Sequence, residues 1–491
     1  MSLDKAGNEG GAGWRLDGSY ARLPAVFHSQ TKPTPVRKPQ MVLFNRVLAL
    51  ELGLDPDRLS GDEGASVFSG NRLPEGAQPI AQAYSGHQFG NFTRLGDGRA
   101  ILLGEQITPD GRRRDIQLKG AGRTPYSRGG DGRAALGPML REYVMSEAMH
   151  ALGIPTTRSL AVVATGEPVF REKTLPGAIL TRVASSHIRV GTFEHLVALG
   201  DVDGLRLLVT HTLERHAPEL LGADNPAVAL LQRAMDLQIS LMTEWARVGF
   251  VHGVMNTDNM ALSGETLDYG PCAFMDGYDP EAVFSSIDHQ GRYAFGRQPD
   301  IAGWNLTRLA ISLLPVIDAD PERALDLARE IMEGYPKRYL SQWLAMMRRK
   351  LGLFTEEAGD EALMGCILGW MEVAKADYTE TFRRLLEGPG VDGGGDPTWS
   401  KFLKIWGQRL ETQPQPWSEV RSLMEANNPA VIPRNHRVEA ALDAAVEGGD
   451  PGPIRELLSV LASPYRATAE VLAAYGPPPA GTARYRTFCG T

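Results

Sequence analysis

Apolar residues in the C-terminal half of the chain recur at helical spacing over long stretches. This spacing predicts helices over residues 321–333, 338–351, 361–381, 399–412, 438–447 and 454–461. Another helix is expected over residues 138–152, because Leu140, Val144, Ala148 and Leu152 form one stripe that Gly153-Ile154-Pro155 ends. Residues 100–103 are continuously apolar, and residues 115–120 alternate as in a half-buried strand. The pattern predicts an α+β fold, with its strands first and a mainly helical second part.

Length and charge narrow the class of protein. At 491 residues the chain exceeds the usual size of one core, so a smaller lobe followed by a larger one is expected. The formal net charge of −8 argues against a nucleic-acid-binding protein, since phosphate backbones require a basic face. Arg112-Arg113-Arg114 does not change this, because it follows Thr108-Pro109-Asp110-Gly111 and is interpreted as the solvated turn of a hairpin.

No apolar run approaches the roughly 20 residues that span a bilayer, so no membrane association is expected. Residues 1–13 are rich in Gly and polar residues and lack the apolar segment of a signal peptide. They are interpreted as a disordered tail of a cytoplasmic protein. Residues 392–396, Asp-Gly-Gly-Gly-Asp, predict a second flexible break.

Two short stretches carry most of the candidate chemistry. Residues 252–259 read His-Gly-Val-Met-Asn-Thr-Asp-Asn, and Asp268-Tyr269-Gly270 follows. Kinase folds place a catalytic Asp five residues before a metal-binding Asn, and a second metal-binding Asp heads an Asp-Phe-Gly. Asn259 and Asp268 retain the oxygen ligands for a hard divalent cation, but Val254 occupies the position of the base. Asp258 supplies a carboxylate next to Asn259, so the base is expected to have moved there.

The other parts of a nucleotide site precede this loop in the order found in a kinase. Gly96 and Gly98, followed by Arg99, form a tight turn before an apolar strand, where backbone N–H groups could approach phosphate. Lys119 ends the next expected strand and is the candidate phosphate ligand. Glu142 and Glu147 lie on the following helix but on different faces, so only one of them can pair with Lys119.

Each of these motifs has a plainer interpretation. Gly96 and Gly98 by themselves fit an ordinary hairpin turn. Ser185-Ser186-His187 suggests a nucleophile, but no Gly-x-Ser-x-Gly surrounds it and no third triad member is indicated. His252 is interpreted as a residue that braces the catalytic loop rather than as a general base.

The order of these motifs and the residues around them resemble the selenoprotein O family, the pseudokinase-fold protein adenylyltransferases. The resemblance covers nearly the whole chain from about residue 15. It is carried by residues 117–128, 131–134 and 182–189, the catalytic loop, Asp268-Tyr269-Gly270, Asn428-Pro429 and residues 433–436. It implies a kinase-like two-lobe fold that binds ATP in a reversed orientation, so that AMP is transferred to a protein hydroxyl.

Carried over position by position, the resemblance implies a role for each site residue. Asp258 is the proton acceptor, and Asn259 and Asp268 bind Mg²⁺ or Mn²⁺. Lys119 pairs with Glu142 and contacts phosphate, and further nucleotide contacts come from Gly96, Gly98, Arg99, Asp131, Gly132, Arg182 and Arg189. The implied organisation is a tail over residues 1–14, an N-terminal extension and N-lobe over 15–195, a helical C-lobe over 196–475 and a flexible tail over 476–491.

The expected activity is ATP-dependent transfer of AMP to Ser, Thr or Tyr hydroxyls of proteins with release of pyrophosphate, with UMP transfer from UTP left open. A true kinase, which would use ATP in the ordinary orientation, and an inactive scaffold remain alternatives. Val254 argues against the kinase and for the scaffold, whereas the intact set of Asp258, Asn259 and Asp268 argues against the scaffold. The identity of the protein substrate, and the choice between Mg²⁺ and Mn²⁺, are not indicated.

Three cysteines are too few for a disulfide framework, and none forms a CxxC pair. Cys366 is interpreted as a buried helix residue. Cys272 follows Asp268 in a segment expected to move, and Cys489 lies on the tail, where it resembles the sulfur counterpart of the selenocysteine of eukaryotic family members. A regulatory Cys272–Cys489 disulfide is therefore one expectation, and two reduced thiols, as is usual in the cytoplasm, are the other.

Overall fold

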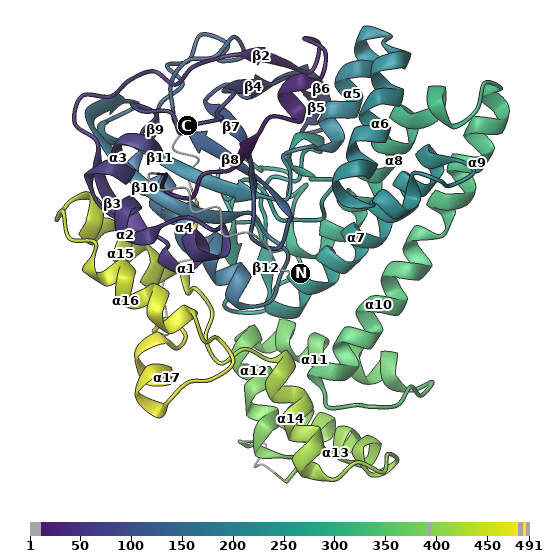
Figure 1. The fold of residues 1–491 in the computed structure, drawn as a ribbon. Coiled ribbons are helices and arrows are strands. Elements are labelled where there is room, and N and C mark those ends of the chain that lie inside the picture. Colours follow the sequence, from purple (N-terminus) through teal and green to yellow (C-terminus); the bar gives the residue numbers. More distant parts are fainter. Residues whose placement is uncertain (1–10, 391–393, 480–484, 488–491) are drawn as a thin grey trace, which may run out of the picture.

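A computed structural model describes residues 11–390, 394–479 and 485–487. It contains a large antiparallel sheet on one side and a mass of helices on the other (Figure 1). The strand order is β2-β4-β7-β8-β11-β10-β3, with β1 paired to β7 and β9 paired to β11, and β5–β6 and β12–β13 form separate two-stranded ribbons. The expected mixture of strands followed by helices is confirmed.

The strands fall mainly in the first 190 residues. They span β1 Leu16–Asp17, β2 His28–Gln30, β3 Gln40–Phe44, β4 Ile80–Gln82, β5 Ser85–Gln88, β6 Asn91–Arg94, β7 Ala100–Ile107, β8 Arg113–Lys119, β9 Ala134–Ala135, β10 Arg158–Phe170, β11 Thr174–Ala184, β12 Phe250–Val251 and β13 Ala273–Phe274.

The helices follow the apolar spacing closely. They span α1 Arg46–Glu51, α2 Pro56–Leu59, α3 Asp62–Phe68, α4 Leu136–Ala151, α5 Val190–Leu199, α6 Val202–His216, α7 Pro226–Val248, α8 Gln298–Ile317, α9 Pro321–Glu333, α10 Tyr335–Lys350, α11 Asp360–Ala374, α12 Tyr378–Arg384, α13 Pro397–Glu411, α14 Trp417–Asn427, α15 Asn435–Val446, α16 Gly452–Leu461 and α17 Ala469–Tyr475. Short 3₁₀ turns join some of them, and one of these, Thr257–Asn259, carries the candidate base.

Alternation along β8 sorts its side chains between two cores. Ile116 and Leu118 are buried against α1–α3 on one face of the sheet. Gln117 and Lys119 point to the opposite face, as successive side chains of a strand must. Helix α4 covers that second face and in turn packs against α15 and α16. The strand therefore presents a lysine to a buried helix, and this geometry begins the site.

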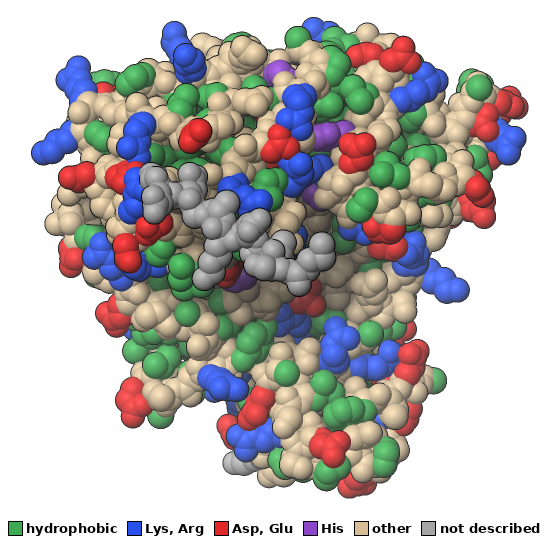
Figure 2. All heavy atoms as spheres, viewed as in Figure 1, with side chains coloured by type: hydrophobic (Ala, Val, Ile, Leu, Met, Phe, Trp, Pro, Cys, Tyr) green, Lys and Arg blue, Asp and Glu red, His purple; other side chains and the backbone are tan. Residues whose placement is uncertain are grey.

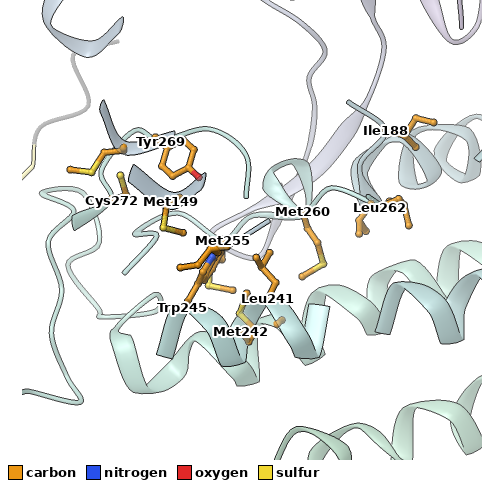
Figure 3. Packing of buried hydrophobic residues seen from close by; sticks show 14 of the residues in the cluster. Met149, Ile188, Leu241, Met242, Trp245, Met255, Met260, Leu262, Tyr269 and Cys272 are labelled. Atoms are coloured by element: carbon orange, nitrogen blue, oxygen red, sulfur yellow. The ribbon is translucent and has the colours of Figure 1, made fainter. Parts of the chain in front are cut away.

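The candidate catalytic loop rests on the largest core. Met255 and Met260 flank the loop and contact side chains of α7, while Tyr269 and Cys272 enter the same core from the segment after Asp268 (Figure 3). The ring of Trp245 stacks on that of His252 at 5.3 Å. His252 also makes a 2.8 Å hydrogen bond between Nε2 and the Leu267 carbonyl oxygen, so the expectation that His252 braces the loop is confirmed.

Four expectations need correction. The helix predicted over 361–381 is interrupted: Lys375 adopts a left-handed conformation at φ 49° and ends α11, and Asp377 caps α12 by accepting from Glu380 N. Cys366 lies on α11 as expected but is exposed, because Leu363, Met364, Ile367 and Met371 occupy the buried face. Cys272 is not on a free segment but is fully buried.

The three consecutive arginines at 112–114 do not all lie on a solvated turn. Only Arg112 lies on the exposed turn. Arg113 and Arg114 belong to β8, where the Arg113 guanidinium lies 2.5 Å from Asp17 and 3.0 Å from the buried Glu105, and Arg114 donates to Ser185. They are partly buried ion-paired residues, since the strand extends two residues further toward the turn than the alternation predicted.

The described residues nearest each end of the chain contact the body of the protein. Ala12 is buried, and its carbonyl accepts from Asp55 N at 3.0 Å. Near the other end, Thr487 Oγ1 donates to the Pro271 carbonyl at 3.0 Å, directly before Cys272. Cys489 lies outside the described residues. Among the described helices, none is both long and apolar enough to cross a bilayer.

Candidate active site

A cavity of about 510 Å³ lies between the sheet and the catalytic loop. It is lined by all but one of the residues that the sequence singled out: Gly96, Gly98, Arg99, Lys119, Asp131, Gly132, Arg182, Arg189, Asp258, Asn259 and Asp268. Glu142 is the exception, and it lies directly behind Lys119. Residues more than 170 positions apart in the chain thus meet around one space.

The cationic wall is held by one buried ion-pair cluster. Lys119 Nζ lies 2.7 Å from Glu142 and 3.0 Å from Asp268. Arg182 bridges the same two carboxylates, and Arg189 Nη1 lies 3.6 Å from Asp268. The expected pairing of Lys119 with Glu142 is confirmed, whereas Glu147 pairs with Arg158 at 2.8 Å. Strands β8 and β11, helix α4 and the Asp268 loop are therefore joined at one point.

Charge within this cluster controls its protonation. Burial opposes the charged form of Glu142, but Arg182 and Lys119 hold the pKa of its carboxyl below the ordinary value. The same cations, with Arg189, hold the pKa of Asp268 well below its usual range despite burial. Asp268 also has φ of +65°, which is uncommon for a residue with a side chain. Its position is thus set by ion pairs rather than by local backbone preference.

Asp258 has the opposite environment. Its Oδ1 atom is buried and has no hydrogen-bond partner among the described residues. Burial raises the pKa of Asp258 to about 6, although the charge of Arg189 opposes this. Arg189 also donates to the Asp258 carbonyl at 2.9 Å, and its guanidinium lies 4.4 Å from the centre of the Tyr84 ring. A carboxyl group with this environment exchanges a proton near neutral pH.

The glycine turn and the loop before α4 close the cavity on the sheet side. The ring of Tyr126 occupies the place where a Cβ of Gly96 would lie, only 2.4 Å away, and Gly96 has φ of +123°. Gly132 has φ of +68° and packs on the Gly122 carbonyl. Asp131 is held at the mouth by Arg171, at 2.8 Å. Glycine suits both positions, because a Cβ would clash with the Tyr126 ring at Gly96 and with backbone at Gly132, and both have a positive φ.

Seven cationic and four acidic side chains line the described part of the cavity: Arg99, Lys119, Arg128, Arg133, Arg171, Arg182 and Arg189 against Asp97, Asp131, Asp258 and Asp268. Arg99 forms no ion pair with any described carboxylate, and burial lowers its pKa. On the face drawn in Figure 2, Lys, Arg and His side chains lie near the centre, with acidic side chains among them. The cavity therefore favours an anionic ligand.

Several residues at this site were not found from the sequence. Asp97 is buried and accepts from Gln82 N at 3.1 Å, which ties the glycine turn to β4. The β5–β6 ribbon is attached to the catalytic turn through Glu194: His87 Nδ1 lies 2.5 Å from one carboxylate oxygen, and Thr257 Oγ1 donates to the other at 2.5 Å. Isolated His, Glu and Thr residues give no spacing signal, so only the structure reveals them.

The C-terminal motif at residues 433–436 reaches the site from behind. Arg434 forms ion pairs with Asp276 at 2.7 Å and Asp377 at 2.6 Å. Asn435 Nδ2 donates to the carbonyl of Phe274 at 2.8 Å. These contacts fix β13, which follows the Asp268 loop, to helices near the end of the chain.

The cavity favours an anionic ligand, and comparisons with known proteins give the class of protein. Residues 15–462 match the family described as protein adenylyltransferase SelO. Proteins described as protein nucleotidyltransferase YdiU are 59% identical over 483 residues in Syntrophotalea carbinolica, covering 98% of each chain, and 56% identical over 482 residues in Geobacillus kaustophilus, covering 98% of this chain and 100% of that protein. A third, from Nitrosococcus oceani, is 56% identical over 98% of both chains.

The chain is thus a protein nucleotidyltransferase. It belongs to the protein adenylyltransferase SelO family.

The ion-pair cluster predicts a large stability effect at Glu142. Glu142→Gln leaves Lys119 and Arg182 buried with one carboxylate fewer, and it should lower the free energy of unfolding by about 3–5 kcal/mol. Glu63→Gln, which removes a carboxylate paired with the largely exposed Arg58 and Arg72, should cost less than about 1 kcal/mol. Urea unfolding followed by tryptophan fluorescence compares the two, and equal midpoints would contradict the prediction.

Proposed function

We propose that this protein transfers AMP from ATP to a hydroxyl group of another protein, with Asp258 as the proton acceptor. One observation carries the proposal: a single cavity places a carboxyl group with a raised pKa next to a buried cationic cluster and a glycine turn. The kinase-like two-lobe organisation, with its division near residue 195, is part of the same proposal. The cytoplasmic location expected from the sequence stays a prediction.

The cationic wall supplies what nucleotidyl transfer requires. The reaction concentrates negative charge on phosphate oxygens, so catalysis depends on positioning and charge neutralisation. Arg99, Arg182 and Arg189 have planar guanidinium groups suited to gripping a triphosphate, and Lys119 adds a point charge. The glycines at 96, 98 and 132 leave backbone close to the cavity, which favours nucleotide contacts there.

A divalent cation fits the oxygen donors that Asn259 and Asp268 bring to the cavity. Asn259 Nδ2 donates to the Val254 carbonyl at 3.0 Å, which leaves its Oδ1 as a ligand oxygen. Asp268 lines the same cavity and adds its carboxylate oxygens. Hard oxygen donors of this kind suit Mg²⁺ or Mn²⁺, which would neutralise phosphate charge when bound.

The proposed step is a nucleophilic substitution at the α-phosphorus of ATP. Asp258 accepts the proton of the incoming Ser, Thr or Tyr hydroxyl, the hydroxyl oxygen bonds to the α-phosphorus, and the bond to the β-phosphate oxygen breaks. Pyrophosphate leaves with the electron pair, and the arginines stabilise it. Asp268 would have to exchange part of its ion pairing with Lys119 and Arg182 when a nucleotide and cation enter, because both cations also face the phosphates.

The alternatives use the same cavity differently. A kinase would transfer the γ-phosphoryl group, but Val254 at the usual base position and the carboxylate at Asp258 disfavour it. A scaffold would need no proton acceptor, yet Asp258 has the raised pKa of one. UTP in place of ATP stays open as a donor.

Label transfer separates the three functions. With ATP labelled on the α-phosphate, the purified protein should transfer label to acceptor proteins in the presence of Mg²⁺ or Mn²⁺. Label on the γ-phosphate should appear only in pyrophosphate. Transfer of γ-label to protein would establish a kinase instead, and transfer of neither label would favour a scaffold.

Two substitutions separate chemistry from binding. Asp258→Ala should lower turnover by roughly 10²–10⁴-fold while ATP affinity changes little, because a base acts in the transition state. Asp268→Ala should abolish transfer and weaken metal-dependent ATP binding. Calorimetry with and without Mg²⁺ gives the affinities, and unchanged Mg²⁺-dependent affinity in the second variant would remove Asp268 from the metal site.

The raised pKa of Asp258 predicts the pH dependence. A proton acceptor works in its charged form, which for this group becomes dominant as pH rises through about 6. The kcat/KM of AMP transfer should therefore rise between about pH 5 and 7 and then level off. Asp131→Asn is the control. Arg171 lowers the pKa of Asp131, so Asp131 is already charged at pH 5, and the variant should keep the rise in kcat/KM even if its maximal rate changes. A flat profile in the unmodified protein would exclude Asp258 as the base.

The cysteine expectation remains testable. Thr487 binds the Pro271 carbonyl, so the described part of the C-terminal tail reaches the residue before Cys272. If a Cys272–Cys489 disulfide forms, mapping under non-reducing conditions should recover a linked peptide pair, and activity should change with dithiothreitol. Free thiols at both positions under mild oxidant, with activity indifferent to reductant, would leave the reduced alternative.

A further inference from the structure

A cationic surface lies beside the catalytic turn, outside the nucleotide cavity. Trp304 on α8 contacts two arginines. The guanidinium carbon of Arg292 lies 4.9 Å from the centre of the Trp304 ring, and that of Arg308 lies 4.7 Å from it. Arg292 also lies 5.7 Å from the Tyr293 ring. All three side chains are half-buried. We call Arg292, Trp304 and Arg308 the arginine ledge.

The arginines of the ledge have no acidic partner. Within residues 11–390, 394–479 and 485–487, neither Arg292 nor Arg308 forms an ion pair, and the Nε atom of each is buried without a hydrogen-bond partner. The nearby Asp288 is buried and accepts from the backbone N–H groups of Arg292 and Tyr293, at 2.9 and 2.8 Å. Glu194 is likewise committed to His87 and Thr257. The ledge therefore keeps two uncompensated positive charges.

Direct contacts connect the ledge to the proposed proton acceptor. The edge of the His87 ring meets Trp304, with ring centres 5.3 Å apart. His87 binds Glu194, which binds Thr257, and Thr257 immediately precedes Asp258. The tip of the β5–β6 ribbon completes the surface, with Gly90 facing Arg292 and Phe92 46% exposed. If a hydroxyl of an acceptor protein reached Asp258, residues next to that hydroxyl in the acceptor could contact this surface.

We propose that the arginine ledge docks an acidic segment of the acceptor protein, a few residues from the hydroxyl that is modified. Cation–π contact with Trp304 restrains both guanidinium groups, so less side-chain entropy is lost when carboxylates bind. Each guanidinium can grip a carboxylate through two hydrogen bonds. The exposed ring of Phe92 adds an apolar contact at the edge. The proposal rests on the proposed transfer of AMP to proteins and specifies which acceptors are preferred.

The test compares two fluorescently labelled peptides that differ only in charge. Each has one central Ser, flanked in one peptide by Glu and in the other by Gln. Anisotropy titration at low salt should show about tenfold tighter binding of the Glu peptide, and the difference should shrink as salt rises. The same ratio should appear in the KM for α-label transfer. Equal binding of the two peptides would overturn the proposal.

Matched variants exclude an indirect effect. Arg292→Gln with Arg308→Gln should abolish the preference, whereas Arg297→Gln should retain it, because Arg297 lies on the same segment but is exposed and paired with Glu281. The charge-reversed double variant, Arg292→Glu with Arg308→Glu, should instead prefer a Lys-flanked peptide. A loss of folding cannot produce that inversion, and its absence in a variant with unchanged ATP affinity would contradict the ledge.

The anisotropy titration tests the arginine ledge independently of AMP transfer. If the protein transfers no α-label to any acceptor but still prefers the Glu peptide through Arg292 and Arg308, the transferase proposal fails and the ledge stands. If α-label is transferred equally to Glu and Gln peptides, AMP transfer stands and the ledge is overturned.

Discussion

The buried ion-pair cluster of Lys119, Glu142, Arg182 and Asp268 is the interaction on which the site depends. Its members come from two strands, one helix and one loop, so no two of these elements can shift independently without exposing an unpaired buried charge. A buried charge that loses its partner destabilises the fold by about 3–5 kcal/mol, whereas an intact buried cluster contributes little net free energy of folding. The cluster thus fixes geometry more than it adds stability.

The same cluster explains why the two important carboxylates of the cavity differ. Asp268 is surrounded by cations, and its pKa is held well below the usual range. Asp258 lies in a buried position with one unpartnered oxygen, and its pKa is raised to about 6. One carboxylate is therefore permanently charged and suited to a cation, while the other can gain and lose a proton. Environment rather than residue type assigns the roles.

Regular patterns in the sequence predicted the elements well. Alternation over residues 115–120 indicated a strand that ends at Lys119, and β8 ends there. The helix over 361–381 was wrong because Lys375 leaves the helical conformation and Arg434, distant in the chain, holds Asp377 as the cap of the next helix. Cys366 was misplaced because an apolar residue on a helix does not by itself indicate which face is buried.

The sequence by itself determined the ordered set of parts: the glycine turn, Lys119, the helix with two glutamates, the catalytic loop without its usual base, and Asp268. Local spacing is sufficient for these because each depends on neighbours a few residues away. Local spacing left Glu142 and Glu147 both open as partners of Lys119; the family resemblance favoured Glu142, and the tertiary structure shows that contact. Only the tertiary structure decided that Cys272 is buried. It alone revealed the Glu194 link to Thr257 and the paired arginines on Trp304. Those features depend on contacts between residues far apart in the chain, which carry no periodic signal.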